Sequence, residues 1–170
     1  MALPRVLKDM MIFNEAQAYV GECASVTVPK LARKLESWRG AGMHRGLKLD
    51  MGGEDDFDIE HSYGGPIRQI FEQYGVLDVA GVGLRFVGAY QNDETGAYDA
   101  VEITVRGRHA EIDMGEGKPG EPGEFKVKTA CAYYKLEWNG ATLIEDDPLN
   151  MVLIVNGVDL YAERRAIFGI

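Results

Sequence analysis

Cysteine, serine and histidine are scarce in this chain of 170 residues, and the scarcity of each excludes some chemistry. Cys23 and Cys131 are far apart and lack C-x-x-C spacing, so we expect buried, reduced thiols rather than a disulfide or a zinc site. No serine lies in a G-x-S-x-G elbow, and no histidine is spaced as a metal ligand with a cysteine. An enzyme would need a site assembled from scattered residues such as His61, His109 and Asp113. We therefore expect no catalytic residues, no metal and no cofactor.

Long hydrophobic runs are also missing. The longest unbroken apolar run, around Met151 to Val155, is far shorter than the roughly 20 residues of a membrane-spanning helix. The opening MALPRVLKDM contains no apolar stretch of the length found in secretory signals. We expect one domain, residues 1–170, made in a cytoplasm and without a membrane anchor.

Two stretches resemble ligand-binding motifs only superficially. In GEGKPG, Lys118 is followed by Pro119 instead of the Ser or Thr of a phosphate-binding loop, and acidic residues surround it. The acidic residues 54–60 do not follow the calcium-loop pattern. A nucleic-acid-binding protein would present a basic, aromatic-rich surface. The acidic body of this chain argues against that class.

Charge is divided unevenly along the chain. The net charge is -9, yet residues 1–48 carry eight basic and four acidic residues, a balance of +4 that leaves -13 for the remainder. A basic arm and an acidic body on one chain are complementary to other copies of that chain. The pattern indicates self-assembly.

Most of the chain after residue 56 shows the alternation of antiparallel β-strands. FDIEHSY places Phe57, Ile59, His61 and Tyr63 on one face, and AVEITVRGR alternates in the same way. A long strand is predicted over EFKVKTACAYYKLEW, and Asn139-Gly140 favours a type I′ hairpin turn into ATLIE. The sequence therefore predicts a mainly β fold, an antiparallel barrel or sandwich, with a wide loop between two of its longest strands.

One segment has helical periodicity instead. In GGPIRQIFEQYG, apolar residues at i, i+3, i+4 and i+7 follow Pro66, and Gly75 provides a stop signal. This predicts one short helix over 66–74 that closes an end or side of the β structure. Its outward residues would be Arg68, Gln69, Glu72 and Gln73.

The stretch TVPKLARKLESWRGAGM gives conflicting signals. Leu31, Leu35 and Trp38 have the spacing of a helix face, whereas the surrounding residues are typical of a strand leaving a sheet. One interpretation is an amphipathic surface helix packed on its own domain. The other is an extended arm or hairpin, at about residues 27–50, whose apolar residues are completed by another copy of the chain.

Five stretches together resemble one family. They are ALPRVLKDMMIFN, SVTVPKLARKLESWRGAGM, VRGRHAEIDMGEGKPGE, YYKLEWNG and DDPLNMVLIVNGVD, and they run in order nearly from end to end. The chain resembles the major tail tube proteins of contractile-tailed bacteriophages, which are related to the tube proteins of R-type tailocins. The likeness is thinnest between about residues 52 and 97.

The resemblance implies a structural protein of the virion tail. Members form sixfold rings in which strands of each subunit complete a ring-shaped barrel, and the rings stack head to tail into a tube inside a contractile sheath. The implied partners are further copies of the chain, the sheath protein, and baseplate and tail-terminator proteins. DNA would pass through the tube without specific binding, or, in a tailocin, the tube itself would puncture the envelope.

Residue roles follow as expectations. For contacts between subunits or rings we expect Arg33, Leu35, Trp38, Arg39 and Met43. For the lumen we expect Asp58, Glu60, Glu102 and Thr104, and for the sheath-facing side the outward residues of the helix. The alternative reading is a monomeric β-barrel module that binds a ligand or a protein. That reading leaves the basic arm and the charge division without a role.

Overall fold

The computed structural model describes residues 2–53 and 57–170. The chain is mainly β, with antiparallel strand pairs throughout, so the predicted fold class is confirmed. No helix in this described part is long and apolar enough to cross a membrane. Part of the acidic cluster seen in the sequence, residues 54–56, lies outside the described residues.

The elements, in chain order, are β1 (Arg5–Asn14), β2 (Gln17–Ala18), β3 (Cys23–Thr27), β4 (Arg33–Trp38), β5 (Leu47–Gly53), β6 (Phe57–Tyr63), α1 (Arg68–Gln73), β7 (Val82–Asn92), β8 (Tyr98–Asp113), β9 (Phe125–Trp138), β10 (Ala141–Asp147), the 3₁₀ turn η1 (Pro148–Asn150), β11 (Val152–Val155), β12 (Val158–Asp159) and α2 (Ala162–Phe168).

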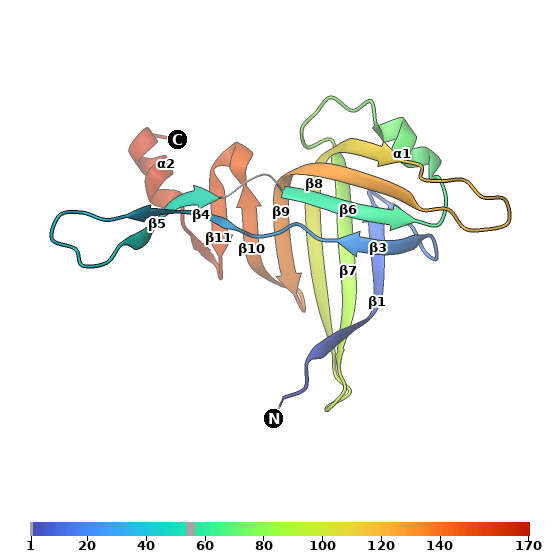
Figure 1. Cartoon of the computed structure of the whole chain (residues 1–170), viewed down its shortest axis with the longest axis horizontal. Coiled ribbons are helices and arrows are strands. Elements are labelled where there is room, and N and C mark those ends of the chain that lie inside the picture. Colours follow the sequence, from blue (N-terminus) through green and yellow to red (C-terminus); the bar gives the residue numbers. More distant parts are fainter. Residues whose placement is uncertain (1, 54–56) are drawn as a thin grey trace.

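The main sheet has the strand order β12-β11-β10-β9-β8-β7-β1-β2, and β6 and β3 branch from it at β9. Residues 125–131 of β9 pair with β6, whereas residues 134–138 pair with β10. We call β3 and β6 the cover layer, because they run across the long strands of the main sheet (Figure 1). The body is thus a two-layer sandwich.

Bulges in β8 and β9 mark where these two strands bend from one layer into the other. The register shifts between the pairs Arg106↔Tyr133 and Gly107↔Cys131, and again between His109 and Glu111. Bulges of this kind bend a strand and increase its twist, so they form the corners of sandwiches. Gly107 sits at this corner, where a Cβ atom would lie 2.0 Å from the Ala130 carbonyl oxygen.

The core lies between the two layers. Ile59 of the cover layer packs with Leu84 and Phe86 of β7 and with Ile103 and Val105 of β8, all of them buried. The alternation predicted for these strands is therefore confirmed. The Asn139-Gly140 turn is also confirmed, since both residues have positive φ, 48° and 81°, as a type I′ turn requires.

Helix α1 adds its residues to a second core cluster. Ile70 is fully buried and packs with Ile12, Tyr63 and Phe125. The helix begins at Arg68, not at Pro66, because Ile67 is extended (φ -114°, ψ 118°) and directs its side chain into the same cluster. The chain also has a second short helix, α2, which the sequence reading missed.

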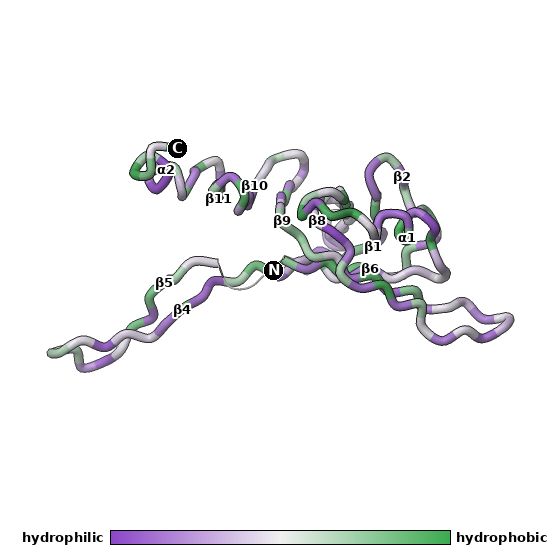
Figure 2. The backbone as a smooth tube through the Cα atoms, turned by 90° about the horizontal axis from the view of Figure 1, so that it is seen from above, coloured by the Kyte–Doolittle hydropathy of each residue, from purple (hydrophilic) through white to green (hydrophobic). Residues whose placement is uncertain are grey.

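Strands β4 and β5 form a separate two-stranded sheet, so residues 33–38 are not helical. We call residues 28–53, which contain this hairpin, the arm. Seen from above, the arm leaves the body at one end, and the loop between β8 and β9 projects from the other end (Figure 2). A lone two-stranded hairpin is marginally stable in water, so the arm has little packing of its own to hold it.

Candidate assembly surfaces

The main sheet is open at both ends. At one end, β2 pairs only with Phe13 and Asn14 of β1, so among the described residues the outer side of Arg5–Met11 has no strand partner. At the other end, β12 is two residues long and pairs only with Ile154 and Val155. Unpaired strand edges present rows of free N–H and C=O groups that another strand can bind. No closed barrel forms within the described part of one chain.

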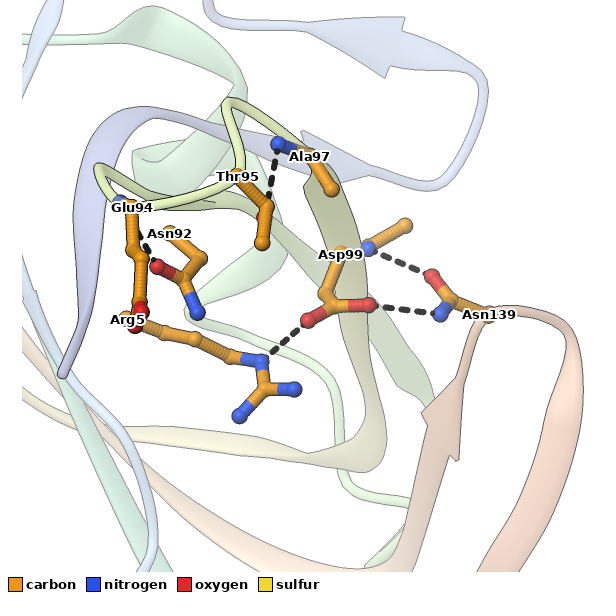
Figure 3. Close-up of polar contacts among 8 residues, drawn as sticks. Arg5, Asn92, Glu94, Thr95, Ala97, Asp99 and Asn139 are labelled. Carbon is orange, nitrogen blue, oxygen red and sulfur yellow. Dashed lines mark hydrogen bonds and ion pairs between the residues drawn. The ribbon is translucent and has the colours of Figure 1, made fainter. Parts of the chain in front are cut away.

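A polar cluster fixes the start of β1 against its neighbours (Figure 3). The Arg5 guanidinium reaches across β7 and donates to Asp99 of β8. Asn139, in the turn between β9 and β10, donates to the other Asp99 oxygen at 2.9 Å and accepts from the Ala100 N–H at 2.8 Å. The hydrogen bonds from Asn139 and Arg5 hold the pKa of Asp99 below its ordinary value. These bonds hold the start of β1 in place, so its free edge belongs to a strand that is fixed at this end.

The two faces of the arm differ in chemistry. Cross-strand pairing places Trp38 beside Leu47, with Leu49 and Met51 further along the same face of β5 and Glu36 of β4 opposite Leu49. These four side chains are exposed, Trp38 by 59%. The other face carries Leu35 opposite Asp50, and Asp50 pairs with Arg33 at 3.5 Å. An apolar face without a core to cover marks an interaction site.

The five predicted contact residues therefore do not form one surface. Leu35 and Trp38, which share a face in a helix, lie on opposite faces of the hairpin because strand side chains alternate. Arg39 and Met43 shape the tip instead: the Arg39 Nε donates to the Met43 carbonyl at 3.1 Å, and the Met43 sulfur lies 3.2 Å from the Gly40 nitrogen. Arg33 stands on the Leu35 side, next to Asp50.

The four predicted lumen residues do not lie together either. Asp58 and Glu60 alternate with Ile59, whose side chain points into the core, so they face outward from the cover layer. Glu102 and Thr104 alternate with Ile103 and face outward from the main sheet, on the other side of the sandwich. One channel wall can contain only one of these pairs. Alternation within each strand was predicted correctly, but the division of these strands between two layers was not.

The polar side of the main sheet has mixed charge. Arg85 pairs with Glu102 at 2.9 Å, and Lys135 pairs with Glu137 at 3.3 Å. Arg106 lies over the Tyr133 ring, 5.3 Å from its centroid, and Tyr133 donates to Glu145 at 2.8 Å. The described basic groups of this face thus already have partners, which leaves no exposed cluster to hold phosphates strongly.

Helix α1 is attached through buried polar groups rather than through apolar ones alone. Gln73 exchanges two hydrogen bonds with Asn14, at 2.6 and 2.9 Å, and Gln69 accepts from the Tyr19 hydroxyl at 2.7 Å. The prediction that Gln69 and Gln73 point outward is therefore wrong: Tyr19, just after β2, holds Gln69, and polar partners in β1 and β8 turn Gln73 inward. Arg68 and Glu72 are exposed and pair with each other at 2.7 Å.

A chain of hydrogen bonds continues from Gln73 through the core. His109 Nε2 lies 3.2 Å from Gln73 Oε1, and the Thr129 hydroxyl lies 2.8 Å from His109 Nδ1 and 3.1 Å from His61 Nε2. His61 Nδ1 is 2.7 Å from the Tyr63 hydroxyl. Burial lowers the pKa of His61 to about 3, with a smaller contribution from His109, and burial lowers the pKa of His109 to about 4. Both histidines are neutral and structural at pH 7.

The hydrogen-bond direction in this chain follows from its end groups. Gln73 Oε1 is an acceptor, so neutral His109 donates from Nε2 and accepts the Thr129 hydroxyl at Nδ1. Thr129 then accepts from His61 Nε2, and Tyr63 donates to His61 Nδ1. No buried side-chain nitrogen or oxygen among the described residues lacks a partner. The sequence analysis, in which His61 and His109 were scattered residues without a shared role, did not predict this cluster.

Comparison with known proteins agrees with the architecture. A family model described as phage tail tube protein FII matches residues 4–169. The chain is 46% identical over 172 residues to the tail tube protein of Escherichia phage P2, with 100% of both chains covered. It is 33% identical over 165 residues to the major tail tube protein of Serratia phage KSP20, covering 96% of this chain and 95% of that one.

A solved structure shares the fold without close sequence similarity. It is the sheath/tube terminator of an extracellular contractile injection system, PVC, in its extended state. The TM-score is 0.59 at 8% identity, and the match covers 79% of this chain and 97% of the other. This likeness supports the fold, and the sequence matches establish the family. The chain belongs to the phage tail tube protein family and is a structural protein of the phage tail.

Proposed function

We propose that six copies of the chain close into a ring through the open edges of the main sheet, and that the rings stack head to tail into the inner tube of a contractile tail. The observation that carries this proposal is the pair of free edges, β1 at one end of the sheet and β11–β12 at the other. A contact between two different edges is heterologous, and repeating it by rotation gives a ring. Pairing also removes the aggregation hazard of exposed edges.

The main sheet, rather than the cover layer, would line the channel. Its two edges, β1 and β11–β12, are the ones that the proposed contact joins, so it is the layer that ring closure makes continuous. Its polar side, with Glu102 and Thr104, would face the lumen, and the cover layer with Asp58 and Glu60 would face outward. The mixed, internally paired charges of the polar side suit a conduit in which DNA slides without being held. In a tailocin the same tube would puncture the envelope.

The outer surface would meet the other tail proteins. The exposed residues Arg68 and Glu72 of α1 are the part of the predicted sheath-facing set that remains available for a sheath contact. Baseplate and tail-terminator proteins would bind the two ends of the tube, where ring-to-ring contacts are left open. The terminator in the structural comparison is consistent with one fold serving both tube and terminator.

The arm would connect copies through its apolar face. Replacing Trp38 with Ala removes the largest exposed side chain of that face, and the free chain loses little because this residue packs against no core. We expect the variant to remain folded and monomeric where the wild-type protein assembles, as measured by sedimentation velocity and circular dichroism. Leu77→Ala is the matched control, since Leu77 is 89% exposed but lies outside the arm. Intact assembly of the Trp38 variant would contradict the role of the arm.

A further inference from the structure

We propose that the arm of one copy binds a specific surface of a second copy, the outer acidic groove beside the β8–β9 loop. This inference rests on the proposed self-assembly and names the surface that receives the arm. The groove lies on the outer side of β6, β8 and β9, and its charged lining is Glu60, Glu111, Asp113, Lys126 and Lys128. The β8–β9 loop, residues 114–124, connects the ends of β8 and β9 that contribute Asp113 and Lys126 to this lining.

The arm offers positive charge that its own copy does not neutralise. Among the described residues, Lys30, Arg39, Arg45 and Lys48 form no ion pair, whereas Arg33 and Lys34 pair with acids inside the arm, at 3.5 and 3.7 Å. All six of these basic residues are exposed. The hairpin pairs only with itself, so these charges are displayed on a projecting ribbon.

The groove offers the opposite charge. Its two lysines are already engaged, Lys128 with Asp58 at 3.2 Å and Lys126 with Glu124 at 3.2 Å. Glu60, Glu111 and Asp113 form no ion pair with another described residue, and neither does Glu121 in the loop. These four carboxylates are exposed. The four arm cations without an ion pair are therefore matched by four carboxylates without an ion pair, three in the groove and one in the adjoining β8–β9 loop.

The two surfaces cannot meet within one copy, because the arm and the β8–β9 loop lie at opposite ends of the molecule (Figures 1 and 2). They do belong to the same layer. The arm joins β3 to β6, and both strands form the cover layer on which the groove lies. In a ring closed through the main sheet, the arm of one copy would extend over the outer side of the next. The partner that fits the arm is thus a second copy of this chain.

Reversal of charge on each surface tests this pairing. An arm variant, Arg45→Glu with Lys48→Glu, and a groove variant, Glu111→Lys with Glu121→Lys, should each raise the concentration needed for assembly by tenfold or more, roughly the effect of 1.4 kcal/mol. An equimolar mixture of the two variants should recover assembly, because each reversed surface then finds its complement. Glu15→Lys with Glu22→Lys changes the net charge as the groove variant does, on exposed residues outside both surfaces, and should assemble normally. Failure of the mixture to recover would overturn the pairing.

Cross-linking tests the contact between arm and groove separately from ring formation. A carbodiimide joins Lys48 or Lys30 to a carboxylate only where the two groups touch, and a mixture of ¹⁴N- and ¹⁵N-labelled wild-type protein identifies links between copies. We expect mixed-isotope links from the arm to Glu111, Asp113 or Glu121. Rings without such links would overturn the inference and leave the proposed function intact. Links in a protein that forms no rings or tubes would support the contact and contradict the proposed function.

Discussion

At the scale of single residues, the most informative group is the buried chain from Tyr63 through His61, Thr129 and His109 to Gln73. It connects β6, β9 and β8 to helix α1, so it fixes how the end of the sandwich is closed. A buried polar chain with every member satisfied specifies one arrangement, since any slip leaves a donor or acceptor without a partner. The histidines act here as positioning groups for α1.

The histidines also make stability depend on pH. Their pKa values in the folded chain, about 3 and about 4, lie below the ordinary value of 6.5. The unfolded chain therefore binds more protons below pH 6.5, and the free energy of unfolding falls as pH decreases from there toward 4. The slope is at most about 1.4 kcal/mol per pH unit for each histidine.

Replacing His109 with Gln should reduce this acid sensitivity by about one proton, because one of the two groups no longer titrates. The loss of its bonds to Thr129 and Gln73 should also cost about 1–3 kcal/mol at pH 7.5. Urea unfolding at pH 7.5 and pH 4.5 measures both effects. His44→Gln is the control, since His44 is exposed on the arm. An unchanged pH slope in the His109 variant would refute this account.

At the scale of elements, the sequence predicted most strands but not how they are layered. The alternation of Ile59, Ile103 and Val105 indicates strands with one buried face, and the structure agrees. Alternation is local, however, and does not show that β6 folds over β8. A signal was present: the buried positions of β9 change from odd numbers at Val127 and Thr129 to an even number at Tyr134. This change from odd to even positions reflects the extra residue of the bulge in β9 at the corner.

Two further elements show what pattern alone leaves open. The sequence predicts the glutamines of α1 on a polar outer face, because nothing in the helix itself shows that Tyr19 binds Gln69 and that Asn14 and His109 bind Gln73. Helix α2 has no buried residue, so packing against the body does not account for it. Its signals in the sequence are confined to its ends: Glu163 in the first turn, Arg165 in the last turn and Gly169, which is left-handed, at the C-cap.

A substitution at Gly107 tests whether the corner between the two layers requires glycine. An alanine there would place its Cβ 2.0 Å from the Ala130 carbonyl oxygen, and backbone on both sides is held by strand pairing. We expect Gly107→Ala to lower the free energy of unfolding by roughly 2–4 kcal/mol, measured by denaturant titration. Gly117→Ala in the β8–β9 loop is the control, since its Cβ would meet nothing within 4 Å. Equal stability of the two variants would show that the corner is more plastic than the structure indicates.

At the scale of the whole molecule, the features that one chain leaves incomplete all fit the proposed contacts with other copies. Both edges of the main sheet are open, the arm has an apolar face with nothing to cover it, and the unpaired charges of the arm and the outer groove are opposite in sign. The sequence predicted the basic arm and the acidic body from charge alone. It could not show that Trp38 shares a face with Leu47, because that depends on the register of β4 against β5.

Electron microscopy of the assembled wild-type protein, at a resolution that separates strands, tests the central claim most directly. We predict rings of six copies, stacked into hollow tubes, in which the outer edge of Arg5–Met11 is paired with the β11–β12 edge of the next copy. Particles that stay monomeric at high protein concentration and low salt would contradict this account. Rings in which those two edges remain unpaired would contradict it equally.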